Sequence, residues 1–402
     1  MGFGGAQIST LELLELLTKH GVELKVLICG SGNERLYSHI NSLGIKIYQT
    51  SCSIVTGYPM MNFENARKVI EWADIVWITD VEYLVAPRIK QLKRVPVVAH
   101  LHSYALICPW WSALYGFKET CTKRCSLWRI IRCKQGINLE LARIGLLSGG
   151  RARLYWFLDF AKGPLDFLRW RKFMSGVLES IDGFIAVSKV MWDIHLKHVP
   201  EIKSKPSVVI YNPVTEPLKY IKPDPGEPYD NYVLYASGSN PVKGPHLLLE
   251  AWSIVSREFR DLKLYMVGCK NSWVESIAKK MNLRNVVFTK KLPSSEHYYL
   301  LYKAKAVAMP SIWPEPFGRI PVEANRLGVP AVVTDRGGLP EIVESNTTSV
   351  ISKTCREAFT NAIVKVVSQE WDRGKIIESS FKHIDPDKTT NSLLKFFEEL
   401  LR

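Results

Sequence analysis

Residues 309–341 read MPSIWPEPFGRIPVEANRLGVPAVVTDRGGLPE, and this stretch decides the fold prediction. The apolar run 306–309 predicts a short strand, and the proline-rich SIWPEPFG that follows it is loop sequence. A helix is expected from about Gly318 to Gly328, because glycine is favoured just past a helix end. The next buried strand is expected at 329–334. The order strand, loop, helix, strand predicts a parallel sheet, in which ligands bind outside the carboxyl ends of the strands.

Two carboxylates in this stretch, Glu315 and Glu323, are separated by seven residues. Glu315 falls in the predicted loop and Glu323 early in the predicted helix. A carboxylate can accept hydrogen bonds from both hydroxyls of a sugar diol, and the first-turn N–H groups of Phe317, Gly318 and Arg319 suit a phosphate. The pattern therefore favours a site for a sugar beside a phosphate. The alternative is that both are solvated glutamates near a helix end, where Glu is common.

The same stretch resembles the E-x7-E signature of retaining nucleotide-sugar glycosyltransferases, family 4 in particular. That resemblance implies the GT-B fold: α/β, with two facing Rossmann-like domains, parallel sheets and an interdomain cleft. It also implies that Glu315 contacts the hydroxyls of the donor sugar and that Glu323 contacts the ribose of the nucleotide.

Composition fits a globular protein with an anionic partner. The chain has 402 residues, enough for two domains, and is 47% apolar and 23% charged. Its net charge of +14 suits a nucleoside diphosphate or an anionic membrane surface. No apolar run is long enough to cross a bilayer, and nothing at the N-terminus resembles a signal peptide. We therefore expect a cytoplasmic protein, with a peripheral position on the cytoplasmic face of the membrane as a further expectation.

The chain opens with GFGGAQ and an amphipathic helix. The pair Gly4 and Gly5 at a helix start would let backbone N–H groups approach a phosphate, although turns also explain such pairs. In the family a strand precedes this loop, and here it is missing. Either the true start lies upstream or the first domain lacks that strand, which would leave a neighbouring strand with an unpaired edge.

Four apolar runs then alternate with helical or loop sequence, at 22–29, 45–48, 75–79 and 95–100, which favours a parallel sheet. His102 follows the last of them. The family resemblance implies that His102 lies at the mouth of the cleft and positions the donor sugar. The family commonly has Asp after this histidine, where this chain has Ser103. A structural role, with the ring satisfied by any backbone partner, is the alternative.

An insert at about 105–175 carries cysteines and basic and aromatic residues. Four cysteines fall within 26 residues but lack the paired C-x-x-C spacing of strong zinc motifs: Cys108, Cys121, Cys125 and Cys133. A structural metal or redox-sensitive clip is one interpretation, and unligated thiols or disulfides the other. No metal is expected for catalysis.

Basic and aromatic residues are interleaved at 151–174, RARLYWFLDFAKGPLDFLRWRKFM. From 118 to 175 there are 13 Lys or Arg against 4 Asp or Glu. This mixture suits a helix on an anionic membrane. An ordinary helical insert packed on its own domain is an equal alternative. No recognised nucleic-acid-binding motif accompanies the charge, so no specific nucleic-acid partner is expected.

Lys243 and Gly244 open a predicted helix in the second half of the chain. A cation at a helix entrance is well placed to face a diphosphate. The resemblance implies that this lysine neutralises the leaving diphosphate. Family members often supply an arginine five residues earlier, where this chain has Gly238. Arg319 or Arg336 is a hypothetical substitute.

Proline and charge crowd the stretch 213–230, which predicts a linker. The expected division is an N-terminal Rossmann-like acceptor domain at 1–212, the linker at 213–230 and a C-terminal donor domain at 231–385. A C-terminal helix at 386–402 is expected to pack back across the linker, as the family implies.

The prediction is a retaining, metal-independent glycosyltransferase. It would move a hexose-type sugar from a nucleotide diphosphate donor to a glycan or lipid-linked acceptor, with no cofactor. The alternatives are a GT-B sugar-nucleotide epimerase, and a non-catalytic glycan-binding or scaffold protein derived from the fold.

Overall fold

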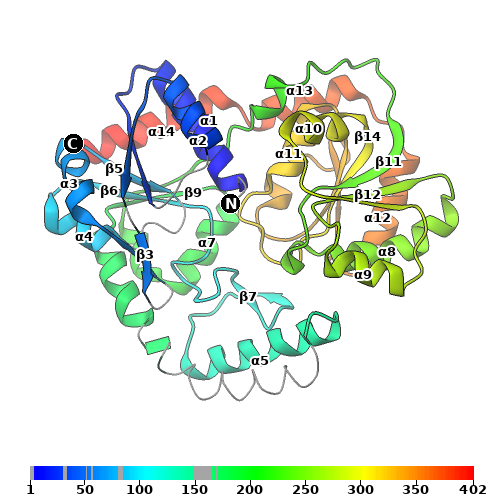
Figure 1. The fold of residues 1–402 in the computed structure, drawn as a ribbon, viewed down its shortest axis with the longest axis horizontal. Helices are drawn as coiled ribbons and strands as arrows, with labels where there is room; N and C mark the ends of the chain where they lie inside the picture. The colour runs from blue at the N-terminus through cyan, green and yellow to red at the C-terminus, as the bar shows by residue number, and fades with distance from the viewer. Residues whose placement is uncertain are drawn as a thin grey trace. The chain divides into compact units, whose positions relative to one another are not determined.

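A computed structural model of the chain describes residues 4–29, 34–50, 52–55, 58–79, 85–147, 165, 167–168 and 170–402. They form two compact α/β units, each discontinuous in sequence (Figure 1). The first unit combines Met1–Trp111, Asp166–Pro213 and Pro386–Arg402, and the second combines Ser112–Leu165 and Val214–Asp385.

The second unit is built on a six-stranded sheet whose paired strands are all parallel. Its order is β13-β12-β11-β14-β15-β16. The strands are β11 (Asp230–Tyr235), β12 (Lys263–Val267), β13 (Val286–Thr289), β14 (Ala304–Met309), β15 (Ala331–Thr334) and β16 (Ser349–Ser352). The order reverses between β11 and β14, and at such a switch point the loops diverge and leave a crevice for ligands.

Helices cover both faces of this sheet (Figure 1). One face packs through Trp252, Phe359 and Ile363 against α8 (Pro245–Glu258), α9 (Trp273–Lys280) and α12 (Arg356–Ser368). The other face carries α10 (Ser294–Lys303), α11 (Arg319–Arg326) and α13 (Arg373–His383). A short 3-10 turn, η4 (Pro241–Lys243), precedes α8, and η5 (Leu339–Glu341) follows β15.

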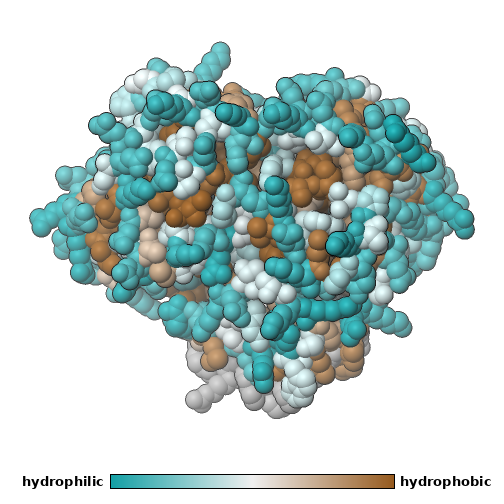
Figure 2. All heavy atoms as spheres, turned by 180° about the vertical axis from the view of Figure 1, so that it is seen from behind, coloured by the Kyte–Doolittle hydropathy of each residue, from teal (hydrophilic) through white to brown (hydrophobic). Residues whose placement is uncertain are grey.

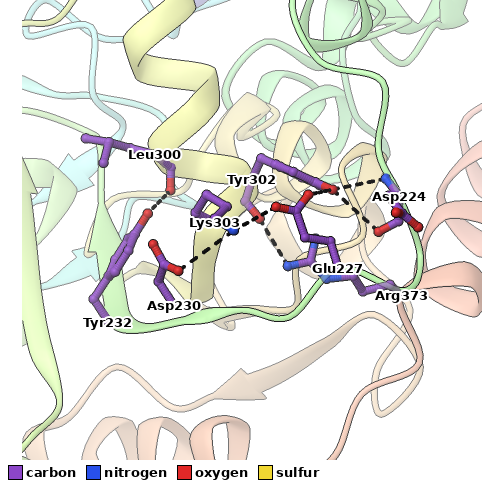
Figure 3. A network of polar contacts seen from close by, with 8 residues as sticks. All are labelled: Asp224, Glu227, Asp230, Tyr232, Leu300, Tyr302, Lys303 and Arg373. Atoms are coloured by element: carbon purple, nitrogen blue, oxygen red, sulfur yellow. Dashed lines mark hydrogen bonds and ion pairs between the residues drawn. The ribbon is translucent and has the colours of Figure 1, made fainter.

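The stretch expected to be a linker is mostly part of the second unit. It contains η3 (Glu216–Lys219), and a polar network fixes the residues before β11 (Figure 3). Lys303 Nζ lies 2.7 Å from Glu227 Oε1, and the backbone N–H of Asp224 donates to the Tyr302 hydroxyl at 3.0 Å. Tyr302 also bonds Glu227, and the Arg373 guanidinium lies 3.8 Å from the Tyr229 ring. The chain between Val214 and β11 is therefore held to the second unit by side chains of α10 and α13.

Arg326, at the end of α11, is fully buried. Its Nε donates to the carbonyl of Val214 at 3.3 Å, and its Nη2 donates to the carbonyl of Ile384. These acceptors are the first and next-to-last residues of the second unit's long segment, where the chain enters and leaves the unit. Val214 has a φ of +50°, which is unusual for a β-branched residue. A single arginine thus holds both ends of that segment.

The first unit has a four-stranded parallel sheet of order β10-β9-β6-β5 and a separate parallel pair, β1-β2. The strands are β1 (Lys25–Cys29), β2 (Lys46–Thr50), β5 (Val76–Thr79), β6 (Val97–Leu101), β9 (Gly183–Ala186) and β10 (Ser207–Val209), with an antiparallel hairpin of β3 (Cys52–Val55) and β4 (Tyr58–Met61). Within the described residues β1 pairs with β2 and β5 with β6, and no strand joins β1 to β5.

Two helices from opposite ends of the chain cover one face of the four-stranded sheet. Leu13 and Leu17 of α1 (Gly5–Lys19) and Leu393 and Phe396 of α14 (Pro386–Leu401) pack with Val98 of β6. The remaining helices of the unit with described bounds are α2 (Glu34–Ser42), α3 (Phe63–Trp72), α4 (Ala86–Leu92), α7 (Lys189–His198) and η2 (Pro200–Ser204). The C-terminal helix therefore belongs to the first unit, although it follows the second in sequence.

Part of the insert differs from its predicted place in the N-terminal domain: the segment Ser112–Leu165 belongs to the second unit, while 105–111 and 166–175 belong to the first. Its hairpin of β7 (Leu114–Tyr115) and β8 (Glu119–Thr120) and its helix α5 (Leu127–Arg143) belong to the second unit. The physical reason is apolar packing, because Leu114, Phe117 and Ile144 are buried against side chains of the second unit. The aromatic residues predicted for the membrane helix fall partly outside the described residues: Tyr155, Trp156, Phe157 and Phe160. Among described residues no helix is long and apolar enough to cross a bilayer.

We expect the stability of the first unit to fall in acid because of His195, a buried residue of α7. Burial lowers its pKa from 6.5 to about 4, with a smaller contribution from His198 in the same direction. The unfolded chain therefore takes up a proton below about pH 6.5 that the folded chain refuses until about pH 4, so stability falls as the pH drops through that window. At pH 5 this costs about 2 kcal/mol relative to pH 7.

We expect His195→Gln to reduce this dependence, measured as urea unfolding free energies at pH 7 and pH 5. His383→Gln is the matched control, since this side chain is exposed and lies on α13 of the other unit. An unchanged pH dependence in His195→Gln would contradict the assignment.

Candidate active site

Two loops meet at the switch point of the second unit. The loop after β11 leads through η4 to Lys243, and the loop after β14 carries Glu315. The loops are joined by backbone, because the N–H of Ile312 donates to the carbonyl of Val242 at 3.0 Å. Lys243 Nζ lies 2.6 Å from Glu315 Oε1, so the structure brings together the cation and the carboxylate that the sequence placed 72 residues apart.

Glu315 is only 5% exposed, and hydrogen-bond donors hold both of its oxygens. Oε1 meets Lys243, while Oε2 accepts from Ser311 Oγ at 2.8 Å and from Trp313 Nε1 at 2.6 Å. Lys243 Nζ also lies 4.7 Å from the centroid of the Trp313 ring. Bonds to a charged group are strong, so this arrangement fixes the orientation of the carboxylate before any ligand arrives.

Glycines allow the backbone to close around this carboxylate. Gly244 has a φ of +71°, and a Cβ there would lie 1.9 Å from the carbonyl oxygen of Pro310. Gly337 has a φ of +60°, and a Cβ there would lie 2.3 Å from the backbone nitrogen and oxygen of Glu315. The N–H of Gly338 donates to the carbonyl of Glu315 at 2.7 Å. Gly337 and Gly338 therefore pack directly against the Glu315 backbone.

Glu323, on α11, forms a second and separate buried pair. Arg319 Nε donates to its Oε1 at 3.0 Å, and His297 Nε2 lies 3.9 Å from its Oε2. Burial alone would raise the pKa of Glu323, but Arg319 and His297 outweigh it, so the pKa lies below its ordinary value. Glu323 is thus held ionised while only 3% exposed.

The N-terminus of α11 follows the Glu315 loop directly. Gly318 precedes the helix with a φ of +95°, and Phe317 before it is buried. The helix begins at Arg319 as predicted, and Gly328 has a φ of +73° just past its end. The first-turn amides therefore start next to the Lys243–Glu315 pair, which is the arrangement that an anion needs.

The cations considered as substitutes for an arginine at position 238 have partners of their own. Arg319 pairs with Glu323, and Arg336 Nε donates to Thr354 Oγ1 at 2.7 Å. Gly238 itself has a φ of +70°, and its Cα would lie 3.2 Å from a Cβ on Gly268. The turn after β11 is therefore shaped for glycine at position 238.

His102, Gly4 and Gly5 belong to the first unit. His102 lies just past β6, with its ring centroid 4.3 Å from that of His100. Burial, and then His102, keep the pKa of His100 well below its ordinary value. Gly4 is the residue before α1, where its N–H donates to Gln7 Oε1 at 3.0 Å.

The four insert cysteines do not gather into a metal site. No group of three or more His, Cys, Asp or Glu side chains within the described ranges could hold a metal ion. Cys133 is buried between the carbonyl of Leu114 and the N–H of Gly116, and Cys121 lies 3.6 Å from Arg129 Nη2. Cys108 lies in the other unit. The metal interpretation of this cluster is therefore not supported by the geometry.

Two sequence profiles cover nearly the whole chain. That of Glycosyltransferase Family 4 matches residues 3–216, more than half of the protein, and that of Glycosyl transferases group 1 matches residues 220–383. The chain belongs to glycosyltransferase family 4. The family resemblance inferred from the E-x7-E stretch is thereby confirmed.

Two curated relatives are similar in sequence to part of this chain. The D-inositol 3-phosphate glycosyltransferase of Corynebacterium urealyticum is 27% identical over 173 residues, which are 40% of this chain and 41% of that protein. Spore coat protein SA of Bacillus subtilis is 29% identical over 121 residues, 28% of this chain and 32% of that protein. The matches thus span less than half of either relative.

A solved structure shares the fold over nearly the full length. Anabaena HepE, crystallised with UDP-glucose, has a TM-score of 0.65 and 16% sequence identity, over 99% of this chain and 97% of that one. The predicted GT-B fold is confirmed.

Sequence reasoning missed two side chains that hold Glu315, namely Ser311 and Trp313. Both lie within four residues of it, in the proline-rich loop SIWPEPFG. Their closeness in sequence to a candidate carboxylate could have indicated that they donate to it. The bend of the loop decides which of the nearby donors reach the carboxylate.

Proposed function

We propose that the protein transfers a hexose-type sugar from a nucleoside diphosphate donor to an acceptor hydroxyl, with retention of configuration. The observation that carries the proposal is the Lys243–Glu315 pair at the switch point of the second sheet, 2.6 Å between Nζ and Oε1. It sets a hydrogen-bond acceptor for sugar hydroxyls beside a cation for phosphate.

Each group has a role that its surroundings allow. Glu315 would accept from hydroxyls of the donor sugar through the remaining lone pairs of its oxygens. The Lys243 ammonium has three N–H donors, of which Glu315 takes one, and its side chain is 22% exposed. The others would meet the β-phosphate, together with the backbone amides of Phe317, Gly318 and Arg319 at the start of α11.

Glu323 would bind the nucleotide ribose. Its Oε1 is held by Arg319, so a ribose hydroxyl would reach Oε2, where His297 is 3.9 Å away. Arg319 is the hypothetical second phosphate contact, an idea that unchanged donor affinity in Arg319→Ala would contradict. In the first unit, His102 would position the donor sugar, and the Gly4–Gly5 turn would approach a phosphate.

In the proposed reaction the bond between C1 of the sugar and the β-phosphate oxygen breaks. The acceptor oxygen bonds C1 on the same face, and its proton passes to the departing phosphate. The developing charge on the diphosphate needs electrostatic stabilisation, which Lys243 and the α11 amides supply. Metal independence and the absence of a covalent nucleophile are parts of the proposal.

For the acceptor we propose a glycan or lipid-linked glycan, reached at an anionic membrane on the cytoplasmic side. Apolar side chains reach the surface in separate patches among polar ones (Figure 2). On α5, Trp128 and Leu139 are 68% and 69% exposed, eleven residues apart on the side of the helix that also exposes Arg132. The stretch 112–147 contains seven basic residues and only two acidic ones. A helix with this face suits an anionic bilayer surface.

We expect the full chain to co-sediment with vesicles containing phosphatidylglycerol and to dissociate at high salt. The double variant Trp128→Ala, Leu139→Ala should lose about tenfold or more in vesicle affinity, because two large apolar side chains no longer enter the interface. Tyr299→Ala, also exposed but on α10, is the control. Equal vesicle binding by the double variant would exclude α5 as the membrane face.

The proposed function is tested by thermal shift against a panel of sugar nucleotides, each compared with its free nucleoside diphosphate. A ligand that binds the folded state raises the melting temperature. The active member should then be turned over, by transfer or by slow hydrolysis. Release of nucleoside diphosphate with an altered free sugar and no acceptor would favour an epimerase instead. No stabilisation by any sugar nucleotide would favour a non-catalytic protein.

A further inference from the structure

The segment 112–147 lies in sequence between two strands of the first unit, yet it packs on both loops of the candidate site. Its buried side chains Leu114, Phe117 and Ile144 form one cluster with Leu247 at the start of α8 and Ile312 in the Glu315 loop. Val242 and Trp313 pack against the same cluster. The apolar face of the insert is therefore buried against the residues next to Lys243 and two positions before Glu315.

Polar contacts add to this packing. Arg336 Nη2 lies 3.4 Å from the carbonyl oxygen of Lys118 at the turn of the hairpin. Arg336 precedes Gly337, which packs directly under the Glu315 backbone. Beside the Lys243 loop, burial lowers the pKa of His246 to about 4, and on α5 Arg143 lowers this pKa further while Glu140 raises it. The insert thus meets three separate segments that surround the carboxylate.

The insert is built as a stiff body. A Cβ on Gly136 of α5 would lie 2.7 Å from the Cα of Gly116, so the hairpin turn sits directly on the helix. Ala113 and Phe117 adopt positive φ angles of 46° and 66°. Such angles are costly for residues other than glycine and persist where the surrounding packing fixes them.

Trp313 connects the insert to the carboxylate. Its ring belongs to the apolar cluster, its Nε1 donates to Glu315 Oε2 at 2.6 Å, and its face lies 4.7 Å from Lys243 Nζ. A shift of the ring would move the donor that orients Glu315 and the surface beside Lys243 together.

We propose that the segment 112–147 is a structural part of the donor site, in which it holds Trp313 and, through Trp313, sets the orientation of the Glu315 carboxylate toward the donor sugar. Trp313 is a positioning residue. This inference rests on the proposed function. It gives the segment 112–147 a role in binding the donor, in addition to any role toward the acceptor or the membrane.

The first test is Trp313→Phe, which keeps a ring in the cluster and removes the N–H. The probes are the sugar nucleotide that most stabilises the wild type in the thermal-shift panel and its own nucleoside diphosphate. We expect affinity for the sugar nucleotide and kcat/KM to fall about 10- to 100-fold, the effect of losing a hydrogen bond to a charged group. Affinity for the nucleoside diphosphate should stay within about twofold, because Trp313 acts on the sugar contact.

A matched control is Trp371→Phe. Its Nε1 donates to the carbonyl of Val366 at 2.9 Å, and its ring packs on the main core of the same unit. It should leave both affinities unchanged. In a Glu315→Gln background Trp313→Phe should have almost no further effect, since a residue that acts through Glu315 cannot act without it.

The second test weakens the insert itself. Ile144→Ala should lower kcat for the sugar nucleotide about tenfold or more by loosening Trp313, because small misplacements in an active site are costly. Ile363→Ala, which opens a cavity in the main core of the unit, should leave kcat per folded molecule unchanged.

Equal loss of both affinities in Trp313→Phe, no loss in either, or additive effects with Glu315→Gln would overturn the inference while leaving the proposed function standing. A wild type that binds no sugar nucleotide would overturn the proposed function and the inference together.

Discussion

Glu315→Gln should lower kcat for sugar transfer at least about a hundredfold, with the fold intact. Glutamine keeps the shape of the side chain but loses the negative charge that Lys243 meets at 2.6 Å, and one of its two terminal groups becomes a donor. It then faces Ser311 and Trp313, which already donate. Loss of a contact that strengthens in the transition state commonly costs this much.

The measurement is steady-state transfer or hydrolysis of the sugar nucleotide, beside a urea unfolding curve for the same variant. Glu357→Gln, an exposed glutamate in the first turn of α12, is the control and should behave as the wild type. Turnover like that of the wild type in Glu315→Gln would remove the donor assignment and with it the proposed roles of Lys243 and the α11 amides.

Arg326→Leu should destabilise the second unit by about 3–5 kcal/mol. Leucine fills part of the space but donates to neither the Val214 nor the Ile384 carbonyl, and a buried carbonyl without a partner costs about 1–3 kcal/mol. The stacking of the guanidinium on Phe381, at 3.8 Å, is lost as well. The acceptors are backbone carbonyls, which remain buried in the variant. No apolar side chain at position 326 can donate a hydrogen bond to them.

Urea unfolding monitored on the second unit measures this effect. Arg326→Lys should lose less, since an ammonium can still donate to one carbonyl, and Arg284→Leu at an exposed position should change stability by less than about 0.5 kcal/mol. A free energy of unfolding for Arg326→Leu within 1 kcal/mol of the wild type would show that the two carbonyls find other donors, contrary to the structure.

The main strands and helices of the fold were predictable because their signals are local. The runs predicted at 306–309 and 329–334 contain the end of β14 and the whole of β15, and the helix expected from Gly318 begins at Arg319. Periodicity and glycine positions carry this information, and neighbouring residues alone decide it. The residues of the E-x7-E stretch also indicated the family correctly.

The place of the insert could not be predicted in this way. Its own pattern, a hairpin and an amphipathic helix, says that an apolar face must be buried but not against which partner. Leu247 and Ile312, which cover that face, lie more than 100 residues away in sequence. The pairing of Arg319 with Glu323 could not be predicted for the same reason. The sequence shows an arginine at this position, but not whether its side chain binds a phosphate or the glutamate four residues later.

The discontinuity of the two units limits how this protein can be divided. The chain passes from one unit to the other at 111/112, 165/166, 213/214 and 385/386. A fragment that starts at Val214 would carry α14 without the first-unit core that buries Leu393, and would lack the insert that covers Ile312. A single protease cut near 213 would likewise leave two halves that each keep part of the other's core. The two halves of the chain should therefore fold more completely when they are co-expressed than when each is produced separately.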